Sequence, residues 1–254
     1  MALAKKRELL YQLWPDVAVI PECSRESMLL CKDDGFDTRW WGENKHKGLG
    51  VLAAKPWALE TARGTAQRFQ QTAHPRSQSL QKLFHQNQLR QKWIAPIRVR
   101  GPRDFLLLSV WACPVGTVRE QNYIGQIYDA IVRHPKWFAE NLPTVICGDF
   151  NSNTIFDPGR RKKKHSSVVE LLSQRGLTSA YHEFYAEMHG AETKPTYYFW
   201  HREERSFHLD YIFVPRDWMR HVLACEVGTY HQWRPASDHM PIVVDVAIDT
   251  AQAA

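Results

Sequence analysis

Acidic and amide side chains stand at the ends of short apolar runs in this chain. The ends of buried strands commonly carry the residues that bind ligands. A buried strand is predicted at 145–148, and it ends in Asp149 with Asn151 two residues further on. Side chains two apart on extended backbone share a face, so Asp149 and Asn151 should point the same way. Taken alone, this stretch could also be an ordinary turn in which Gly, Asp and Asn only shape the backbone.

The same arrangement recurs three times. A predicted strand at 208–214 carries Asp210, another strand follows directly after Asp238 and His239, and an earlier apolar run ends in Glu22. Four strand ends therefore present acids or amides. Such groups could bind a hard divalent cation and activate a water molecule.

At these residues the chain resembles the endonuclease/exonuclease/phosphatase superfamily of Mg²⁺-dependent phosphoesterases. Gly-Asp-Phe-Asn, Leu-Asp-Tyr-Ile-Phe and Ser-Asp-His stand in the family's order, and the similarity extends over 16–246. The resemblance implies an α/β (α+β) fold, a four-layer sandwich of two mixed β-sheets flanked by helices. It also implies that Glu22 binds Mg²⁺, or Mn²⁺ in its place, and that Asp238 joins the metal shell.

The resemblance further implies catalytic roles for five residues. Asp149 would position and deprotonate the attacking water, and Asn151 would offer its amide to the phosphate or to that water. His239 would donate to the phosphate, with Asp210 fixing its tautomer. Tyr123, at the entry to a predicted helix, would reach the scissile phosphate; a packing role at the helix end is the alternative.

Six further side chains are candidates for substrate contact, each with an ordinary structural alternative. An aromatic, glycine-rich stretch supplies two that could instead pack at the rim of the core, and the predicted strand at 208–214 supplies a histidine expected to share the face of Asp210. A basic run at 160–165 supplies three that could instead be a solvated loop. The candidates are Trp40, Lys47, His208, Arg161, Lys162 and Lys163.

Periodicity and turn signals predict the elements that must position these groups. Helices are expected at 3–13, 123–131 and 167–177, and a hairpin is expected to join strands at 93–100 and 105–112. The polar, glutamine-rich residues 61–92 are interpreted as a variable surface region.

Composition favours one α/β domain spanning 1–254, because 44% of its 254 residues are hydrophobic and no linker or repeat divides it. Five irregularly spaced cysteines indicate reduced core thiols. No apolar run reaches the ~18 residues that cross a bilayer, which favours a soluble, cytoplasmic protein, expected to be a monomer. A net charge of +6 and a pI near 9.1 suit a polyanionic partner.

Three functions remain open from the sequence. The first is a nuclease, favoured by the basic charge and by ten tryptophans that could stack on bases. The second is a phosphoesterase for a phospholipid or inositol phosphate head group, and the third is a binding protein that has lost turnover. The setting Pro21-Glu22-Cys23 departs from the Gln-Glu-Thr of abasic-site endonucleases.

The resemblance also predicts a missing element. Members of the superfamily begin with a buried strand that ends in an asparagine, followed by the helix that leads to the glutamate strand. Here Met1 falls at the start of that helix, and the first asparagine is Asn44. We therefore expect the first strand to be absent from these 254 residues.

Overall fold

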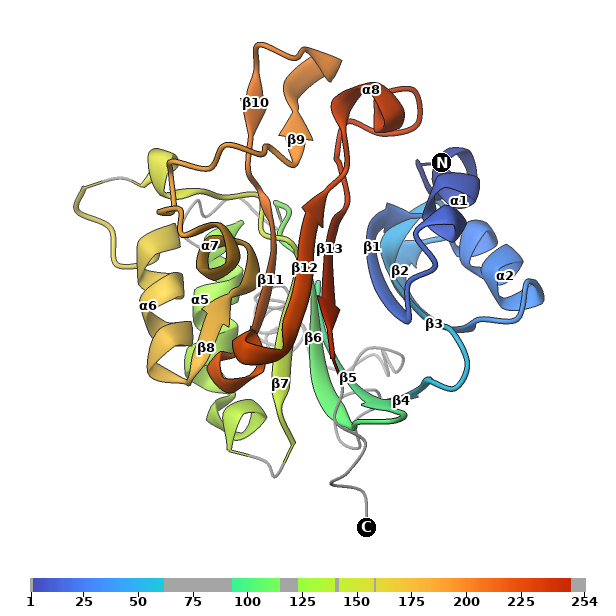
Figure 1. Cartoon of the computed structure of the whole chain (residues 1–254), viewed down its shortest axis with the longest axis horizontal. Coiled ribbons are helices and arrows are strands. Elements are labelled where there is room, and N and C mark those ends of the chain that lie inside the picture. Colours follow the sequence, from blue (N-terminus) through green and yellow to red (C-terminus); the bar gives the residue numbers. More distant parts are fainter. Residues whose placement is uncertain (1, 62–92, 115–122, 140–141, 158, 248–254) are drawn as a thin grey trace, which may run out of the picture.

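The computed structural model describes residues 2–61, 93–114, 123–139, 142–157 and 159–247. Its elements form four layers, two of helices outside and two of strands between them (Figure 1). This is the sandwich that the sequence predicted. The region predicted to be variable, 61–92, lies outside the described residues except for position 61.

One inner layer is a six-stranded sheet with the order β4-β5-β6-β7-β11-β8. The neighbours β6 and β7 are parallel and the other pairs are antiparallel, so the sheet is mixed. Its strands are β4 (Ala58–Thr61), β5 (Ile94–Arg100), β6 (Phe105–Trp111), β7 (Thr144–Asp149), β11 (Asp210–Pro215) and β8 (Leu177–Ser179).

The other inner layer consists of two antiparallel pieces. One is a three-stranded sheet with the order β1-β3-β2, and the other pairs β12 with β13. These strands are β1 (Val17–Cys23), β2 (Asp37–Asn44), β3 (Lys47–Ala53), β12 (Val222–Val227) and β13 (Ile242–Val246). A short hairpin of β9 (Tyr197–Tyr198) and β10 (Ser206–Phe207) rises beyond the layers (Figure 1).

Helices cover both outer faces (Figure 1). On one side of the molecule lie α5 (Ile124–Arg133), α6 (His165–Gln174) and α7 (Ala180–Tyr185), and on the other lie α1 (Ala2–Gln12) and α2 (Arg25–Asp33). The short helix α8 (Tyr230–Trp233) precedes β13. None of the described helices is long and apolar enough to cross a membrane.

Alternation along β6 shows how one strand supports two cores. Leu106 and Leu108 belong to the core formed with α5 and α6, whereas Phe105 and Leu107 belong to the core between the two strand layers. Successive side chains of a strand point to opposite faces, and here both faces are buried, which explains the continuous apolar run of β6.

Most predicted elements are confirmed with small shifts at their ends. The helix expected at 167–177 begins earlier, at His165, and the strand expected at 208–214 begins later, at Asp210. The hairpin joining β5 and β6 is present as expected. All five cysteines are free thiols, three of them buried, as the sequence predicted.

A cavity of about 490 Å³ separates β1 from β13. It is lined along one side by residues of β1 and along the other by residues of β13, both of which are terminal strands in their sheets. Six of the thirteen predicted site residues line this cavity, and they form its polar end, here called the mouth: Glu22, Asp149, Asn151, Asp210, Asp238 and His239.

Candidate active site

The centre of the site is a pair of carboxylates on adjacent strands. Asp149 ends β7, Asp210 begins β11, and the two residues are directly paired in the antiparallel register. Asp149 is 3% exposed. With His239 they form a group whose ligand atoms all lie within 4.8 Å of one another. Residues far apart in the sequence therefore converge where the two strand ends meet.

His239 is held against Asp210 by a hydrogen bond of 2.8 Å between its Nδ1 and Asp210 Oδ2. The same oxygen accepts a bond of 2.7 Å from Thr196 Oγ1. Around this pair, an isolated bridge joins Tyr197 to His239, and the Met240 amide donates to the Thr196 carbonyl. Asp210 thus fixes the position of the imidazole and holds a proton on its Nδ1.

The electrostatics of this group follow from burial and mutual charge. Burial raises the pKa of Asp149, and the neighbouring charge of Asp210 raises it further. Burial alone would lower the pKa of His239, but the charge and hydrogen bond of Asp210 outweigh it and raise that pKa to about 9. Asp210 therefore favours the cationic form of the His239 imidazole, which can donate a proton or a hydrogen bond.

Asn151 closes back onto Asp149. Its backbone N–H donates to Asp149 Oδ1 at 2.7 Å, and its side-chain amide lies 3.5 Å from Asp149 Oδ2. The backbone of Asn151 has φ of 47°, a left-handed conformation that asparagine tolerates better than most residues. The turn after β7 therefore holds the acid and the amide together by a hydrogen bond, and not by the extended backbone that the prediction assumed.

Glu22 approaches from the other strand layer. Its backbone has φ of 56°, and its carboxylate lies 2.9 Å from the Lys47 ammonium. Glu22 and Asp238 both line the mouth of the cavity, and the charge of Glu22 contributes to the raised pKa of Asp149. The site thus collects acids from both halves of the sandwich.

This donor set fits a hard divalent cation. Glu22, Asp149 and Asp238 line one cavity, and burial together with the charges of Asp210 and Glu22 raises the pKa of Asp149. A bound cation would offset both effects. Mg²⁺ prefers a few carboxylates together with water. Lys47 already supplies one positive charge to Glu22.

Comparison with known proteins decides the family. The sequence profile of the Endonuclease/Exonuclease/phosphatase family matches residues 110–239, just over half of the chain. The chain belongs to this family. The matched region includes Asp149, Asp210 and His239. A comparison with the sequences of curated proteins gives no significant match.

Solved structures share the fold at low sequence identity. An AP endonuclease from Archaeoglobus fulgidus has a TM-score of 0.62 at 13% identity, covering 96% of this chain and 95% of its own. The 3'-5' exonuclease NExo from Neisseria meningitidis has a TM-score of 0.58 at 14% identity, with coverage of 96% and 95%. The catalytic domain of Xenopus laevis APE2 has a TM-score of 0.62 at 14% identity, with coverage of 96% and 88%.

Two other predicted site residues, Tyr123 and Trp40, do not line the cavity. Tyr123 precedes α5 with φ of 48° and is 40% exposed, outside the described lining of the cavity. The Trp40 indole N–H donates to the Cys23 carbonyl, one residue after Glu22, which favours its packing role. For both residues, contact with substrate stays a prediction.

His208 differs from expectation. Its ring is buried and faces away from the cavity, with Nδ1 2.8 Å from the Lys194 carbonyl oxygen and the ring against Tyr181. The expectation assumed extended backbone from 208 onward, but β11 begins only at Asp210, so the two-residue period does not reach His208.

The residues of the basic run at 160–165 differ in their contacts. Lys163 forms an ion pair of 2.8 Å with Asp129, a buried residue of α5, so its main contact is structural. Lys162 is exposed and Arg161 is half-buried, and neither lines the described cavity. A role in substrate binding stays a prediction for these two.

Two features of the site escaped sequence reasoning. Thr196 Oγ1 donates to Asp210 and accepts from the backbone N–H groups of Leu209 and Asp210. Trp200, 64% exposed on the β9–β10 hairpin, has the guanidinium groups of Arg202 and Arg205 within 5.9 and 5.2 Å of its ring centre. The sequence alone does not indicate a role for a single threonine. A tryptophan followed closely by two arginines, in contrast, could have been recognised in the sequence as a possible contact for nucleic acid.

Proposed function

We propose that this protein is a Mg²⁺-dependent phosphodiesterase that hydrolyses nucleic acid. The observation that carries the proposal is the convergence of Asp149, Asp210 and His239 within 4.8 Å, at a cavity mouth that also presents Glu22. One buried acid able to take a proton and one cationic imidazole able to give one are the two groups that hydrolysis requires.

The residues of the chain divide the work as follows. Asp149 holds the attacking water and accepts its proton, because burial and the neighbouring Asp210 raise its basicity above that of an ordinary carboxylate. Asn151 donates its amide to a phosphate oxygen. His239 donates to another oxygen as negative charge develops.

Glu22 and Asp238 would hold the metal ion, with Asp149 close by. When bound, Mg²⁺ supplies positive charge that neutralises the phosphoryl oxygens and the leaving oxygen. Lys47, 2.9 Å from Glu22, would then be free to turn toward the substrate backbone.

Nucleic acid as the substrate is favoured by the surface beside the site. The hairpin of β9 and β10 begins at Tyr197, which pairs with His239, and carries exposed Trp200 between two arginines. An exposed indole with nearby guanidinium groups suits an unstacked base and its phosphates. The named activities of the structural relatives, a 3'-5' exonuclease and AP endonucleases, point the same way.

The decisive experiment offers the purified chain a panel of substrates with Mg²⁺. The panel contains single-stranded, duplex and abasic DNA, RNA, and phospholipid and inositol phosphate esters. We expect hydrolysis of at least one nucleic acid and its loss in EDTA. Hydrolysis of head-group esters alone would replace the proposed substrate class, and binding without turnover of any substrate would refute the proposed activity.

The surface contribution can be tested separately with Trp200→Ala. Stacking of one base is worth ~1–3 kcal/mol, so KM for single-stranded DNA should rise about fivefold or more with kcat little changed. Leu223→Ala removes an exposed apolar side chain of similar exposure (71%) from β12 and serves as the control. An equal KM in the two variants would remove Trp200 from the substrate surface.

A further inference from the structure

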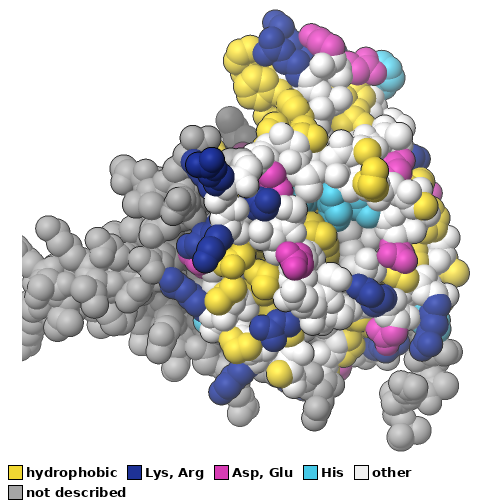
Figure 2. All heavy atoms as spheres, turned by 90° about the vertical axis from the view of Figure 1, so that its left-hand side faces the viewer, with side chains coloured by type: hydrophobic (Ala, Val, Ile, Leu, Met, Phe, Trp, Pro, Cys, Tyr) yellow, Lys and Arg dark blue, Asp and Glu magenta, His cyan; other side chains and the backbone are white. Residues whose placement is uncertain are grey.

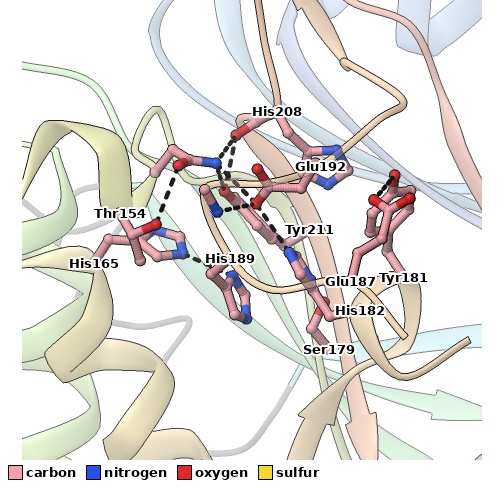
Figure 3. Close-up of polar contacts among 12 residues, drawn as sticks. Thr154, His165, Ser179, Tyr181, His182, Glu187, His189, Glu192, His208 and Tyr211 are labelled. Atoms are coloured by element: carbon pink, nitrogen blue, oxygen red, sulfur yellow. Dashed lines mark hydrogen bonds and ion pairs between the residues drawn. The ribbon is translucent and has the colours of Figure 1, made fainter. Parts of the chain in front are cut away.

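A second cluster of titratable side chains lies on the helix-covered side of the six-stranded sheet, apart from the candidate active site (Figure 3). Its members come from the start of α6, from α7, and from the loop that follows α7. We call this the histidine cluster, and it consists of His165, His182, His189 and Glu192. Nothing in the proposed hydrolysis uses these residues.

The spacing of the cluster matches a metal site. His182 Nε2 lies 2.9 Å from Glu192 Oε1, and His165 Nε2 lies 3.4 Å from His189 Nδ1. His182, His189 and Glu192 each offer a ligand atom within 4.8 Å of the others. Around tetrahedral zinc, ligand atoms stand about 3.3 Å apart, given Zn–N bonds of ~2.0–2.1 Å.

The protonation states also suit a cation. Burial opposes ionisation of Glu192, but hydrogen bonds led by the one from His182 outweigh it and lower the Glu192 pKa to about 2. Burial lowers the pKa of His165 to about 4 and that of His189 to about 3. One carboxylate and neutral imidazoles with available lone pairs are the forms that bind zinc.

Only one ring nitrogen of the buried His165, its Nε2, has a polar neighbour among the described residues, and that neighbour is His189 Nδ1. The Nε2 atom of His165 is therefore the one that would bind the ion.

Surrounding groups orient the ligands as they do at metal centres. Ser179 Oγ lies 2.7 Å from His182 Nδ1, which leaves Nε2 of the same ring facing Glu192. The carboxylate also accepts from Asn153 Nδ2 at 2.9 Å and from the Gly190 N–H at 3.0 Å (Figure 3).

We propose that the histidine cluster binds one Zn²⁺ ion, with His165, His182, His189 and Glu192 as its ligands. Imidazole nitrogen favours zinc over Mg²⁺, which prefers oxygen, so the two sites select different metals. The rings of His182 and His189 lie nearly parallel, 20° apart with centres separated by 3.5 Å. An imidazole binds in its own plane, so one ring must turn, and the half-buried His189 is the one we expect to move.

The ion would have a structural role. It would join α6, α7 and the loop after α7 over β11, the strand that begins with Asp210. Asn153 connects the two regions, because its amide donates both to Glu192 and to the His208 carbonyl, two residues before Asp210. His189 is half-buried, so zinc can enter from solution at its ring. The face of the molecule that carries α5, α6 and α7 shows interspersed acidic, basic and histidine side chains (Figure 2).

The test measures metal content and thermal stability of the full chain. After incubation with Zn²⁺ and gel filtration, elemental analysis should find about one zinc per chain. Co²⁺ in its place should give the visible absorption of a four-coordinate nitrogen and oxygen site. Phenanthroline, added with excess Mg²⁺ present, should lower the melting temperature by several degrees.

Variants separate this site from others in the chain. Glu192→Gln keeps the hydrogen-bonding shape but removes the charge, and with His189→Ala it should reduce bound zinc at least tenfold. His231→Ala, at an exposed histidine on α8, and Asp149→Asn, in the candidate active site, should both keep the zinc.

Two outcomes would overturn the proposal. Zinc lost in Asp149→Asn but kept in Glu192→Gln would place the ion elsewhere. The wild-type chain could also show no Co²⁺ absorption and a melting temperature that neither Zn²⁺ nor phenanthroline changes. The histidine cluster would then be a hydrogen-bond network without a metal, whatever the results for the variants.

Discussion

Asp149 stands directly opposite Asp210 in the antiparallel pairing of β7 with β11. Two carboxylates in adjacent strands repel each other, and burial strengthens the effect because little water screens them. His239 and Thr196 both donate hydrogen bonds to Asp210, whereas burial and the neighbouring charge of Asp210 raise the pKa of Asp149. Asp210 is thus engaged with His239, and Asp149, whose basicity is raised, is the acid that we assign as the base.

Asp149→Asn should separate catalysis from stability. The amide cannot accept the proton of water, so hydrolysis should fall at least ~100-fold, the usual scale for losing a general base. The melting temperature should be unchanged or higher, because the substitution removes the repulsion between Asp149 and Asp210. Steady-state rates and thermal unfolding check both parts. Retention of more than a third of the wild-type rate would exclude Asp149 as the base.

His239→Ala should be as severe as loss of Asp149, since it removes the cationic donor. Asp210→Asn should be milder if its task is to orient the imidazole, because an amide oxygen still accepts from His239 Nδ1. Rates measured side by side give the order. A harmless Asp210→Asn beside an inactive His239→Ala would show that the bond of 2.8 Å between them has no part in turnover.

Thr196→Val tests the support beneath this pair. Thr196 Oγ1 bonds to the Asp210 carboxylate and to two backbone N–H groups, so the isosteric change leaves buried polar atoms unpaired. We expect a loss of about 1–3 kcal/mol in unfolding free energy, measured by urea denaturation, and a reduced kcat. Thr196→Ser keeps the hydroxyl and should restore both. Thr178→Val, at an exposed bond to Glu183, is the control, and equal losses in the two Val variants would contradict the assignment.

The basic run should show two different effects. The double variant Arg161→Ser, Lys162→Ser should raise KM for nucleic acid, weaken the salt dependence of KM and leave kcat little changed. Charges on a loop attract the polyanion equally in the ground state and in the transition state, so they affect binding and not turnover. Lys163→Ser should instead lower the melting temperature, since it leaves the buried Asp129 unpaired. KM measured across a salt series decides the first part, and an unchanged slope would make the run a solvated loop.

The sequence predicted most of the site because its signals are local. Asp149, Asn151 and His239 sit in short motifs at strand ends, and the order of those motifs implied the fold that brings them together. The position of His208 could not be predicted, because it depends on where β11 begins. The pairing of Lys163 with Asp129 and the role of Thr196 depend on tertiary contacts between residues 34 and 14 positions apart, respectively. Such contacts leave no pattern in the sequence.

The cavity between β1 and β13 lies between the terminal strands of the two antiparallel pieces of the second strand layer. One strand placed there would join β2-β3-β1 to β13-β12 and complete a second six-stranded sheet beside the first. The apolar side chains that line this space would be stabilised by polypeptide that covers them.

We propose that an apolar strand fills this cavity and that its last residues reach the mouth beside Glu22 and Asp149. A chain extended at its N-terminus by an apolar strand should then melt at a higher temperature than these 254 residues and hydrolyse its substrate faster with Mg²⁺. Thermal unfolding and initial rates, measured side by side at equal protein concentration, make the comparison. Binding of a hydrophobic dye should also fall in the longer chain, because the apolar walls formed by Val17, Val19 and Val244 would be covered. Equal melting temperature, rate and dye binding in the two chains would show that the cavity is filled by water and that the site works without a further strand.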